Sequence, residues 1–511
     1  MSFLPGFKKK DFIQKKNRTG RIFLIFCAAC ILSCASRTYV TRLSKTENFF
    51  NSLRFESAVN EIRPLAENAR SRDRLLYLME AGIILHTMGS YENSNNALRE
   101  AEALADAAVK SVSKSAAAFL LNDTKNAFIG ENFERVQIKF YIALNYLLLG
   151  DIESAKRYFR RLNYELRDMK FFDAEFKQNI CARYIDAVIS EQLENFNDAR
   201  VEYNNISALL PEFTQINSDR YVLALKSGDE AEMKKYETHR TDVLSYNQSA
   251  QRVPYRKGMA ELLIINQAGK SAVKASRGKI ANDQAFLDIM RAGIAIAVMN
   301  QGAGLSTTTL IAMVSQSENP VPVYRMRDPL GALPLHIILN GNKIGRTVML
   351  DTFSQTTQLF YNQNYQKIVS RNVASIASKV VVAAVAAKVA SDELNKAAGI
   401  GGNPLGFLVS GAVGAGMGKA VSETINPDLR CWRLLADNTQ VLRFFLEPGT
   451  YTIDAEFPYP KPFSNHTKRE IILAENGFKV ICIRSMTGDT SMQPPVKVPL
   501  DVKAVQAELR N

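Results

Sequence analysis

The spacing of apolar residues divides the chain into two halves near residue 250. From about Thr41 to about Glu237, apolar residues recur three and four positions apart, which is typical of amphipathic helices. After about Ala250, shorter apolar runs are separated by Asn-Gly and Pro-Gly pairs, which is typical of strands and turns. We therefore predict an α+β protein, with a helical domain over residues 34–250 and a β-rich domain over residues 251–511.

One spacing recurs in the helical half. A small residue is followed seven positions later by a turn residue, and after nine, twelve, sixteen and nineteen positions by residues suited to helix packing. A weak copy starts at Thr46 and a degenerate one at Tyr221. Because small residues let helices pack closely and a turn residue joins them, this spacing predicts a stack of helix pairs. The clear copies are Gly82, Gly89, Tyr91, Ser94, Leu98 and Ala101; Ala143, Gly150, Ile152, Ala155, Phe159 and Leu162; and Ala187, Glu194, Phe196, Ala199, Tyr203 and Ile206.

The best copy, "IALNYLLLGDIESAKRYFRRLN" at residues 142–163, resembles the tetratricopeptide repeat (TPR). The copies start 36, 61, 44 and 34 residues apart, so only the last interval matches the usual ~34 residues. Such arrays form curved solenoids whose concave face holds peptides or other proteins. We expect a TPR-like solenoid that binds a partner. The alternative is a solenoid that packs only on its own C-terminal half.

Three hairpin signals indicate that the second half of the chain is rich in β-strands. Each consists of two apolar runs around a turn pair, and together they predict an antiparallel β-sandwich-like domain. Residues 260–270 predict a further strand, whereas residues 286–304 fit either a strand or a helix. The three hairpins are residues 334–350 around Asn340–Gly341, residues 441–457 around Pro448–Gly449, and residues 469–484 around Asn476–Gly477.

An insertion at about residues 367–425 is rich in alanine, valine and glycine. An apolar helix is followed by "GIGGNP" and by a second segment that places Gly406, Ser410, Gly414 and Gly418 four residues apart. Small residues at this spacing lie on one helical face and let two backbones approach closely, so we predict a helical hairpin. The hairpin could cover the sheet, contact another protein or enter a membrane. Interrupting charges such as Lys379 and Lys388 weigh against the membrane.

The N-terminus carries the marks of an export signal. Basic residues through Arg21 precede an apolar run from Ile22 to Leu32, which is about half the ~20 residues of a spanning helix. The stretch "ILSC", ending at Cys34, resembles a bacterial lipobox. This resemblance implies a signal peptide over residues 1–33 and a lipid, such as palmitate, on Cys34. An uncleaved anchor and a metal or redox site are the alternatives. The second lacks a partner cysteine pair.

The net charge of the chain is much smaller once the predicted signal peptide is excluded. The chain has a formal charge of +13, of which residues 1–33 carry +6, so +7 remains. This mild excess, without a basic run interleaved with aromatics, does not indicate nucleic-acid binding. The stretch that ends in Gly418–Lys419 lacks the first glycine and the final Ser or Thr of a phosphate-binding loop. We therefore expect neither nucleic acid nor nucleotide as a partner.

No catalytic motif or metal-ligand cluster is evident, and we predict no cofactor and no enzymatic activity. Glu131 and Glu134 lie three residues apart before an apolar helix and share one face. We expect them to pair with Arg135, Lys139 or Arg160 inside the solenoid. Two cysteines of the β-rich half, Cys431 and Cys482, could form a disulfide or remain separate buried thiols. The latter is the simpler expectation.

Taken together, the chain resembles a little-characterised family of bacterial lipoproteins with tetratricopeptide-like repeats. The resemblance rests on residues 78–102, on residues 130–161, on the glycine-rich helix that leads into residues 426–451, and on the lipobox. It implies an envelope protein that faces the periplasm and gives Trp432 a packing role. Ala35–Ser36 lack an acidic retention signal, which by resemblance favours the outer membrane.

These patterns predict a lipid-anchored scaffold or adaptor that binds other envelope proteins through its solenoid, with a membrane contact made by the lipid. One alternative is a regulator of cell-wall synthesis or a peptidoglycan-binding lipoprotein. Another is a component of an envelope-spanning motility or secretion machine. A further class, an unrecognised hydrolase, would require a deep polar pocket with converging carboxylates.

Overall fold

The computed structural model describes residues 39–68, 70–113, 127–168, 179–301, 306–397, 425–459, 462–487 and 499–510. The chain divides into two compact units, Met1–Ser44 and Lys45–Asn511. The features below belong to the second unit, apart from the first residues of one helix. The predicted lipidation site Cys34 and the predicted small-residue stripe of Gly406, Ser410, Gly414 and Gly418 lie outside the described residues.

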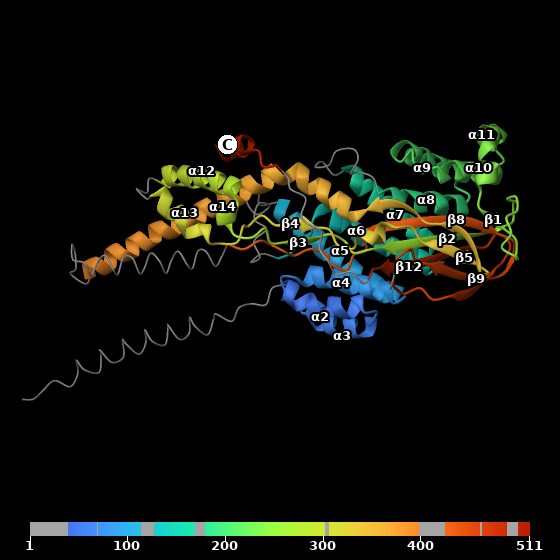
Figure 1. The fold of residues 1–511 in the computed structure, drawn as a ribbon, viewed down its shortest axis with the longest axis horizontal. Coiled ribbons are helices and arrows are strands. Elements are labelled where there is room, and N and C mark those ends of the chain that lie inside the picture. The colour runs from blue at the N-terminus through green and yellow to red at the C-terminus, as the bar shows by residue number, and fades with distance from the viewer. Residues whose placement is uncertain are drawn as a thin grey trace, which may run out of the picture. The chain divides into compact units, whose positions relative to one another are not determined.

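The described chain up to Tyr236 consists of helices in consecutive pairs (Figure 1). Each pair is joined by a short turn, and neighbouring pairs pack on one another from α3 to α10. The helical repeats predicted from the sequence are therefore present. The pairs are α2 (Tyr39–Asn51) and α3 (Phe55–Glu67), α4 (Arg74–Thr87) and α5 (Tyr91–Ser113), α6 (Asn132–Leu148) and α7 (Ile152–Asp168), α8 (Ile180–Gln192) and α9 (Phe196–Leu209), and α10 (Gln215–Ser227) and α11 (Glu230–Tyr236).

The five turn residues of the repeat spacing all adopt a left-handed backbone. Their φ angles are 58° at Leu53, 83° at Gly89, 82° at Gly150, 57° at Glu194 and 70° at Gly228. A left-handed residue ends a helix and frees the chain to reverse, and glycine adopts this conformation without strain. Leucine and glutamate do so at a cost of about 1–2 kcal/mol each.

The β-rich half contains two main sheets that share one hydrophobic core. The larger sheet has the order β1-β8-β2-β12-β10, with β7 also paired to β8, and the smaller has the order β11-β9-β5-β6. A short pair, β3 and β4, lies apart from them. The strands are β1 (Ser245–Tyr246), β2 (Ala260–Ala268), β3 (Val273–Ala275), β4 (Val323–Arg325), β5 (His336–Leu339), β6 (Asn342–Arg346), β7 (Val348–Thr352), β8 (Asn438–Leu446), β9 (Gly449–Glu456), β10 (Phe463–Ser464), β11 (Arg469–Leu473) and β12 (Phe478–Met486).

One of the three predicted hairpins is confirmed. β5 and β6 pair in antiparallel fashion around Asn340 and Gly341, whose φ angles of 48° and 85° are those of a tight hairpin turn. The hairpin predictions at Pro448–Gly449 and Asn476–Gly477 are wrong. At each of these turns the chain passes from one sheet to the other, so β8 and β9 do not pair, and neither do β11 and β12.

The purely antiparallel architecture is also wrong, because the larger sheet is mixed. β12 runs parallel to β2, with Phe478 opposite Glu261 and Ser485 opposite Ala268. Every residue of β2 and of β8 is buried, which is typical of strands covered on both faces. The turn residues in the sequence indicate where the chain reverses but not which strand it joins. Local sequence patterns therefore do not specify which strands pair.

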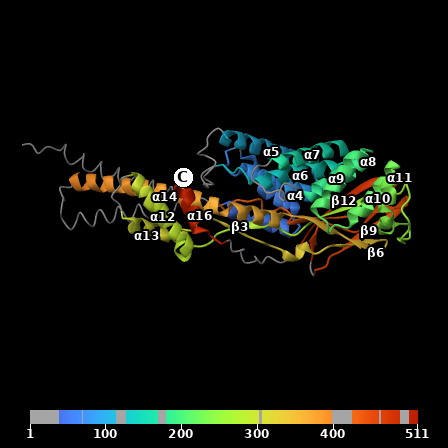
Figure 2. The same cartoon turned by 90° about the horizontal axis from the view of Figure 1, so that it is seen from above.

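Four helices form a second helical group (Figures 1 and 2). They are α12 (Gln284–Gln301), α13 (Thr307–Ser315), α14 (Phe353–Ala397) and α16 (Val502–Arg510), and short 3-10 turns lie at Glu237–Asp242, Ile280–Asn282 and Pro329–Ala332. The ambiguous residues 286–304 thus belong to a helix. α14 begins before the predicted insertion and packs on α12 at Gly293, where an added Cβ would lie 2.5 Å from Val373 Cγ1.

One described segment has the length and composition of a membrane span. Residues Phe353–Ala386 of α14 contain a window with a mean hydropathy of 1.5, of which 44% is buried inside the protein. A long core helix passes the same test. The burial of Tyr365, Val369 and Val373 along one face shows that this helix packs on protein over much of its length.

We expect the turns to differ in their response to substitution. Gly150→Ala should lower the free energy of unfolding by about 1 kcal/mol, because no side chain blocks the new Cβ and only the left-handed backbone resists it. Glu194→Gly should leave the free energy of unfolding unchanged or raise it by up to about 1 kcal/mol, since it removes strain at an exposed turn. Urea denaturation measures both. An equal loss in the two variants would contradict the shared turn geometry.

Candidate functional site: the surfaces of the helical repeats

The first helix of each central pair is enclosed by protein. Twelve of the fourteen residues of α4 are buried, and eleven of the thirteen residues of α8 are buried. A helix of a surface array buries one stripe and exposes the other. These helices are therefore covered on both sides, by their own repeat partners and by the C-terminal half of the chain. The inner face of the repeats is closed.

A segment of the chain itself lies on this inner face. Residues 425–437, here the linker segment, run between α14 and β8 without forming a helix or a strand. Two carboxylates of the repeats accept its backbone N–H groups. The N–H of Trp432 donates to Glu134 Oε1 at 2.8 Å, and the N–H groups of Arg433 and Leu434 donate to Glu80 at 2.7 and 3.0 Å. The segment is held as a solenoid would hold a peptide.

The side chains of the linker segment extend this contact. Arg433 pairs with Glu47 at 2.9 Å, and Arg430 pairs with Asp73 at 3.0 Å. Trp432 is fully buried, with its ring 6.0 Å from that of Tyr141 on α6. The packing role expected for Trp432 is thus the one it has. The segment is bound through its backbone, its charges and its single large aromatic side chain.

The pair Glu131 and Glu134 caps α6 and reaches the other half of the chain. Glu134 Oε2 accepts the backbone N–H of Glu131, which completes a capping box. Glu131 pairs with Lys274 at 2.8 Å, and burial raises the pKa of Glu134 to about 6. The Glu131–Lys274 ion pair and the capping contact of Glu134 both differ from the predicted pairing with Arg135, Lys139 or Arg160. The expected partners are engaged elsewhere: Lys139 with Glu102 and Glu165, Arg160 with Asp198, and Arg135 with Gly130 and Asn132.

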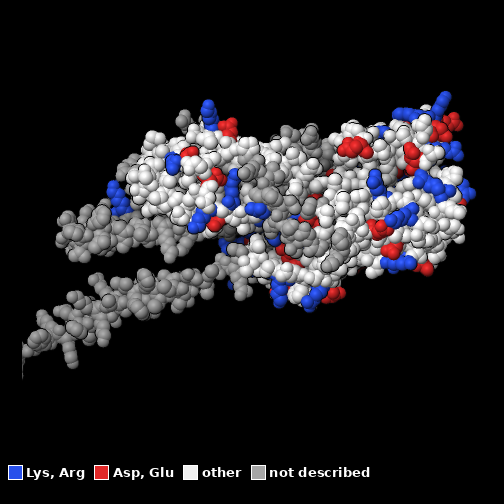
Figure 3. Space-filling model, in the orientation of Figure 1, with Lys and Arg blue, Asp and Glu red and all other residues white. Residues whose placement is uncertain are grey.

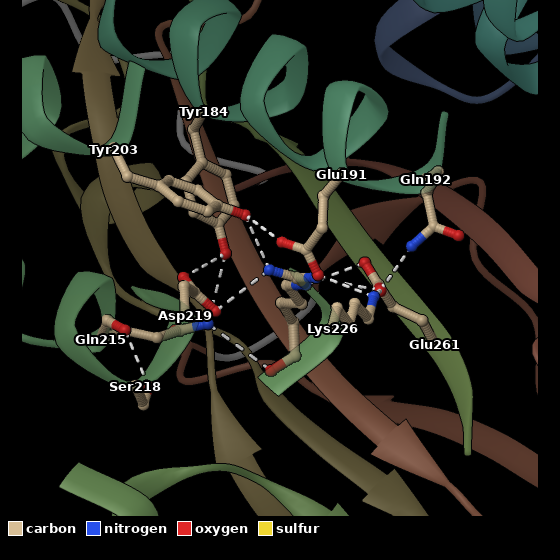
Figure 4. A network of polar contacts seen from close by, with 10 residues as sticks. Tyr184, Glu191, Gln192, Tyr203, Gln215, Ser218, Asp219, Lys226 and Glu261 are labelled. Atoms are coloured by element: carbon tan, nitrogen blue, oxygen red, sulfur yellow. Dashed lines mark hydrogen bonds and ion pairs between the residues drawn. The ribbon is translucent and has the colours of Figure 1, made fainter. Parts of the chain in front are cut away.

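A second buried polar cluster joins the repeats to the larger sheet (Figure 4). At its centre is Arg443 of β8, which is fully buried. Its guanidinium donates to both oxygens of Glu261 on β2, at 2.8 and 2.9 Å, and to Glu191 on α8 at 2.6 Å. It also donates to Tyr203 at 2.8 Å and to Asp219 at 3.4 Å. All five N–H groups of the arginine therefore have acceptors.

The charges of this cluster balance. Lys226 of α10 lies 2.6 Å from Glu191 and 3.0 Å from Glu261, so two cations face these two carboxylates. Burial opposes the ionisation of Glu191, but Arg443 and Lys226 outweigh it and hold its pKa below the usual range. Burial raises the pKa of the third carboxylate, Asp219, to about 7. The cluster is thus a closed structural contact with no site for a ligand.

A half-buried cysteine lies close to a buried histidine, which contacts a buried asparagine. Cys482 Sγ lies 3.9 Å from His86 Nε2, and His86 Nδ1 lies 2.6 Å from Asn145 Oδ1. A Cys-His-Asn order occurs in papain-like proteases. Here burial raises the pKa of Cys482 to about 12 and lowers the pKa of His86 to about 4. At neutral pH the thiol is protonated and the imidazole is neutral, so this is not an activated nucleophile.

The three described cysteines, Cys181, Cys431 and Cys482, are free thiols, so the disulfide alternative is wrong. Among the described residues, no group of three or more His, Cys, Asp or Glu is placed to hold a metal ion. On the face of the molecule seen in Figure 3, the described basic and acidic side chains are interspersed. A surface of this kind does not produce a strong field of one sign.

The outer surface of the repeats, in contrast, is hollowed. A groove with a volume of about 1260 Å³ is lined by residues of α7, α8 and α9, together with Asp106 and Lys139. Large apolar side chains are exposed along it: Tyr164 is 61% exposed, Val201 56% and Leu209 37%. Exposed apolar side chains beside a concave surface are typical of a protein-binding site.

Two polar side chains in this groove are buried without partners. Asp186 is 5% exposed and Asn163 is 6% exposed. Asp186 Oδ1 and both amide atoms of Asn163 make no hydrogen bond with the part of the chain that the structure describes. Burial first, and the neighbouring Glu202 carboxylate second, raise the pKa of Asp186 to about 7. An unpaired buried polar group costs free energy, so these atoms are suited to a bound partner.

The motif residues of the repeats serve packing. Ala143, Ala155 and Phe159 are fully buried. At Gly82 an added Cβ would lie 2.4 Å from Leu98 Cδ2, so the two helices of that pair meet there. Gly150 makes the turn described above. Tyr91 borders a smaller pocket of about 530 Å³ that Cys482 also lines.

The sequence did carry signals for the residues that prediction missed. Arg443 interrupts the apolar run "VLRFFL", and Asp186 interrupts the apolar helix "CARYIDAVIS". Charged residues are almost never fully buried unless they are paired. A charge in an apolar element therefore marks either a buried ion pair, as at Arg443 and Arg183, or a buried group without a hydrogen-bond partner among the described residues, as at Asp186. Which one it marks depends on distant residues.

Arg443→Met should lower the free energy of unfolding by about 3–5 kcal/mol, because it leaves carboxylates buried without their main cation. The control is Arg256→Met, which removes the exposed pair with Glu447 and should cost less than about 1 kcal/mol. Urea denaturation compares the two. Equal small losses would show that the Arg443 cluster does not hold the two halves together.

No protein-family model matches the chain, and no curated protein matches it. Solved structures similar to parts of it include a tetratricopeptide repeat protein from Parabacteroides merdae ATCC 43184, with 16% identity and a TM-score of 0.28. The match covers 39% of this chain and 63% of that protein, less than two thirds of its length.

Two further solved structures are similar over a comparable share of the chain. MamA AMB-1 is 14% identical with a TM-score of 0.25, and the match covers 39% of this chain and 90% of MamA. The TPR2AB domain of yeast Sti1, in its complex with pHSP90, is 12% identical with a TM-score of 0.18, and the match covers 40% of this chain and 90% of that domain. The repeat architecture is shown by the helix pairs of this chain itself, and not by these matches.

Proposed function

We propose that this protein is a lipid-anchored scaffold of the bacterial envelope, which faces the periplasm and binds another envelope protein through the outer groove of its helical repeats. The observation that carries the proposal is the groove between α7 and α9, with its exposed apolar side chains and buried unpartnered Asp186. The anchor part rests on the lipobox-like sequence that ends at Cys34.

The closed inner face supports this choice of surface. Repeat arrays commonly hold their partners on the concave side. In this protein the linker segment and β8 fill that side and satisfy its buried carboxylates. A partner would have to displace several charge-assisted hydrogen bonds to enter there. The outer groove requires no such displacement, because its apolar side chains are already exposed.

The anchor is tested by Cys34→Ala. We expect the full-length variant to leave the membrane fraction while the unit Lys45–Asn511 keeps its stability, because Cys34 is not part of that unit. Cell fractionation and urea denaturation of the released protein measure the two properties. A Cys34→Ala protein that stays bound to the membrane would shift the membrane contact to α14, whose apolar window is long enough to span.

The groove is tested by a photo-crosslinking amino acid in place of Val201, in cells. We expect a crosslinked adduct with one envelope protein, because Val201 is exposed inside the groove. The matched control carries the same amino acid in place of Ile472 of β11, which is 74% exposed and lies outside the groove. The same adducts from both positions, or none from Val201, would refute binding at the groove.

A further inference from the structure

The outer groove has one buried carboxylate that is left without a cation. Three other carboxylates that line it form ion pairs: Glu165 with Lys139, Asp198 with Arg160, and Glu202 with Arg183. Asp106 is exposed to solvent. Asp186 differs from all of these because it is both buried and unpaired among the described residues. Asn163, which lines the same groove, is likewise buried and has no hydrogen-bond partner among the described residues.

We propose that Asp186 and Asn163 receive a lysine or arginine side chain from a peptide segment of the partner protein, whose flanking apolar residues contact Tyr164, Val201 and Leu209. This deepens the proposed function and rests on it. A buried carboxylate gains most from a charged donor, and an amide oxygen that lines the same groove can accept a further N–H from the bound segment. A long basic side chain can place its charge at depth while its methylene groups cross the apolar rim.

The cations near Asp186 are engaged by other carboxylates. Glu202 and Asp198 approach it from α9, whereas Arg160 and Lys156 approach from α7 and Arg183 lies on its own helix. The cations of this set are already held: Arg160 and Lys156 by Asp198, and Arg183 by Glu202. Three cations and two carboxylates thus surround Asp186, and each of the three cations contacts one of those carboxylates, so none of them forms an ion pair with Asp186 in the part of the chain that the structure describes.

The protonation of Asp186 makes the recognition dependent on pH. Burial raises the pKa of this carboxylate to about 7, so the free protein is partly protonated there at neutral pH. A bound cation favours the ionised form. Affinity for a basic peptide should therefore strengthen as the pH rises through about 7 and level off above it. An uncharged peptide should show no such change.

The test uses the detergent-solubilised full-length protein and short fluorescent peptides, measured by fluorescence anisotropy. The peptides carry leucines on both sides of a central residue that is lysine, norleucine or glutamate. We expect the lysine peptide to bind about tenfold more tightly than the norleucine peptide, in keeping with a charged hydrogen bond. Asp186→Asn should remove both this difference and the pH dependence.

The matched control is Glu153→Gln, an exposed carboxylate of α7 outside the groove, which should leave every affinity unchanged. The comparison among peptides on the unaltered protein does not depend on how well a variant folds. Equal affinities for the three peptides, no binding of any peptide, or tighter binding of the glutamate peptide would overturn the inference. If the Val201 position gives an adduct but the peptides give one of these results, only the role of Asp186 is overturned and the proposed function stands. Absence of the adduct would overturn the proposed function.

Discussion

The structure depends on buried carboxylates of the helical repeats that find their partners in the C-terminal half of the chain. Glu191 binds Arg443, while Glu80 and Glu134 bind backbone N–H groups of the linker segment. A buried carboxylate without a partner costs several kcal/mol. Neither half can therefore bury these groups by itself, and the two halves form one structure rather than a scaffold with an appended module.

The sequence predicted what is local and missed what is distant. The turns at Gly89 and Glu194 follow from a spacing within one helix pair, and both residues are left-handed as that spacing requires. The partner of Glu131 is Lys274, 143 residues away, and that of Glu80 is the backbone at Arg433, 353 residues away. No local pattern specifies such pairs. The same reason explains why the strands after Pro448 and Asn476 were assigned to the wrong neighbours.

The two faces of the repeats have different chemistry. On the inner face, Glu47 and Glu80 are engaged by the linker segment, and Trp432 is fully buried, although its indole N–H has no partner among the described residues. On the outer face, apolar side chains are exposed and two buried polar side chains lack partners. In a folded protein, buried polar groups are nearly always satisfied, so an exception needs an explanation. This difference between the faces is the reason why we propose the outer groove, and not the inner face, as the binding surface.

The position of the linker segment along the chain constrains the order of folding. Glu80, Glu134 and Glu191 lie in the helix pairs that emerge first. The N–H groups that bind Glu80 and Glu134, and the Arg443 guanidinium that joins Lys226 at Glu191, lie beyond residue 430. Contacts between such distant residues slow folding, because a long loop must close before they form. During synthesis, the repeats are therefore made before these partners. A chain whose long-range contacts are still incomplete is prone to aggregation until these last residues are made.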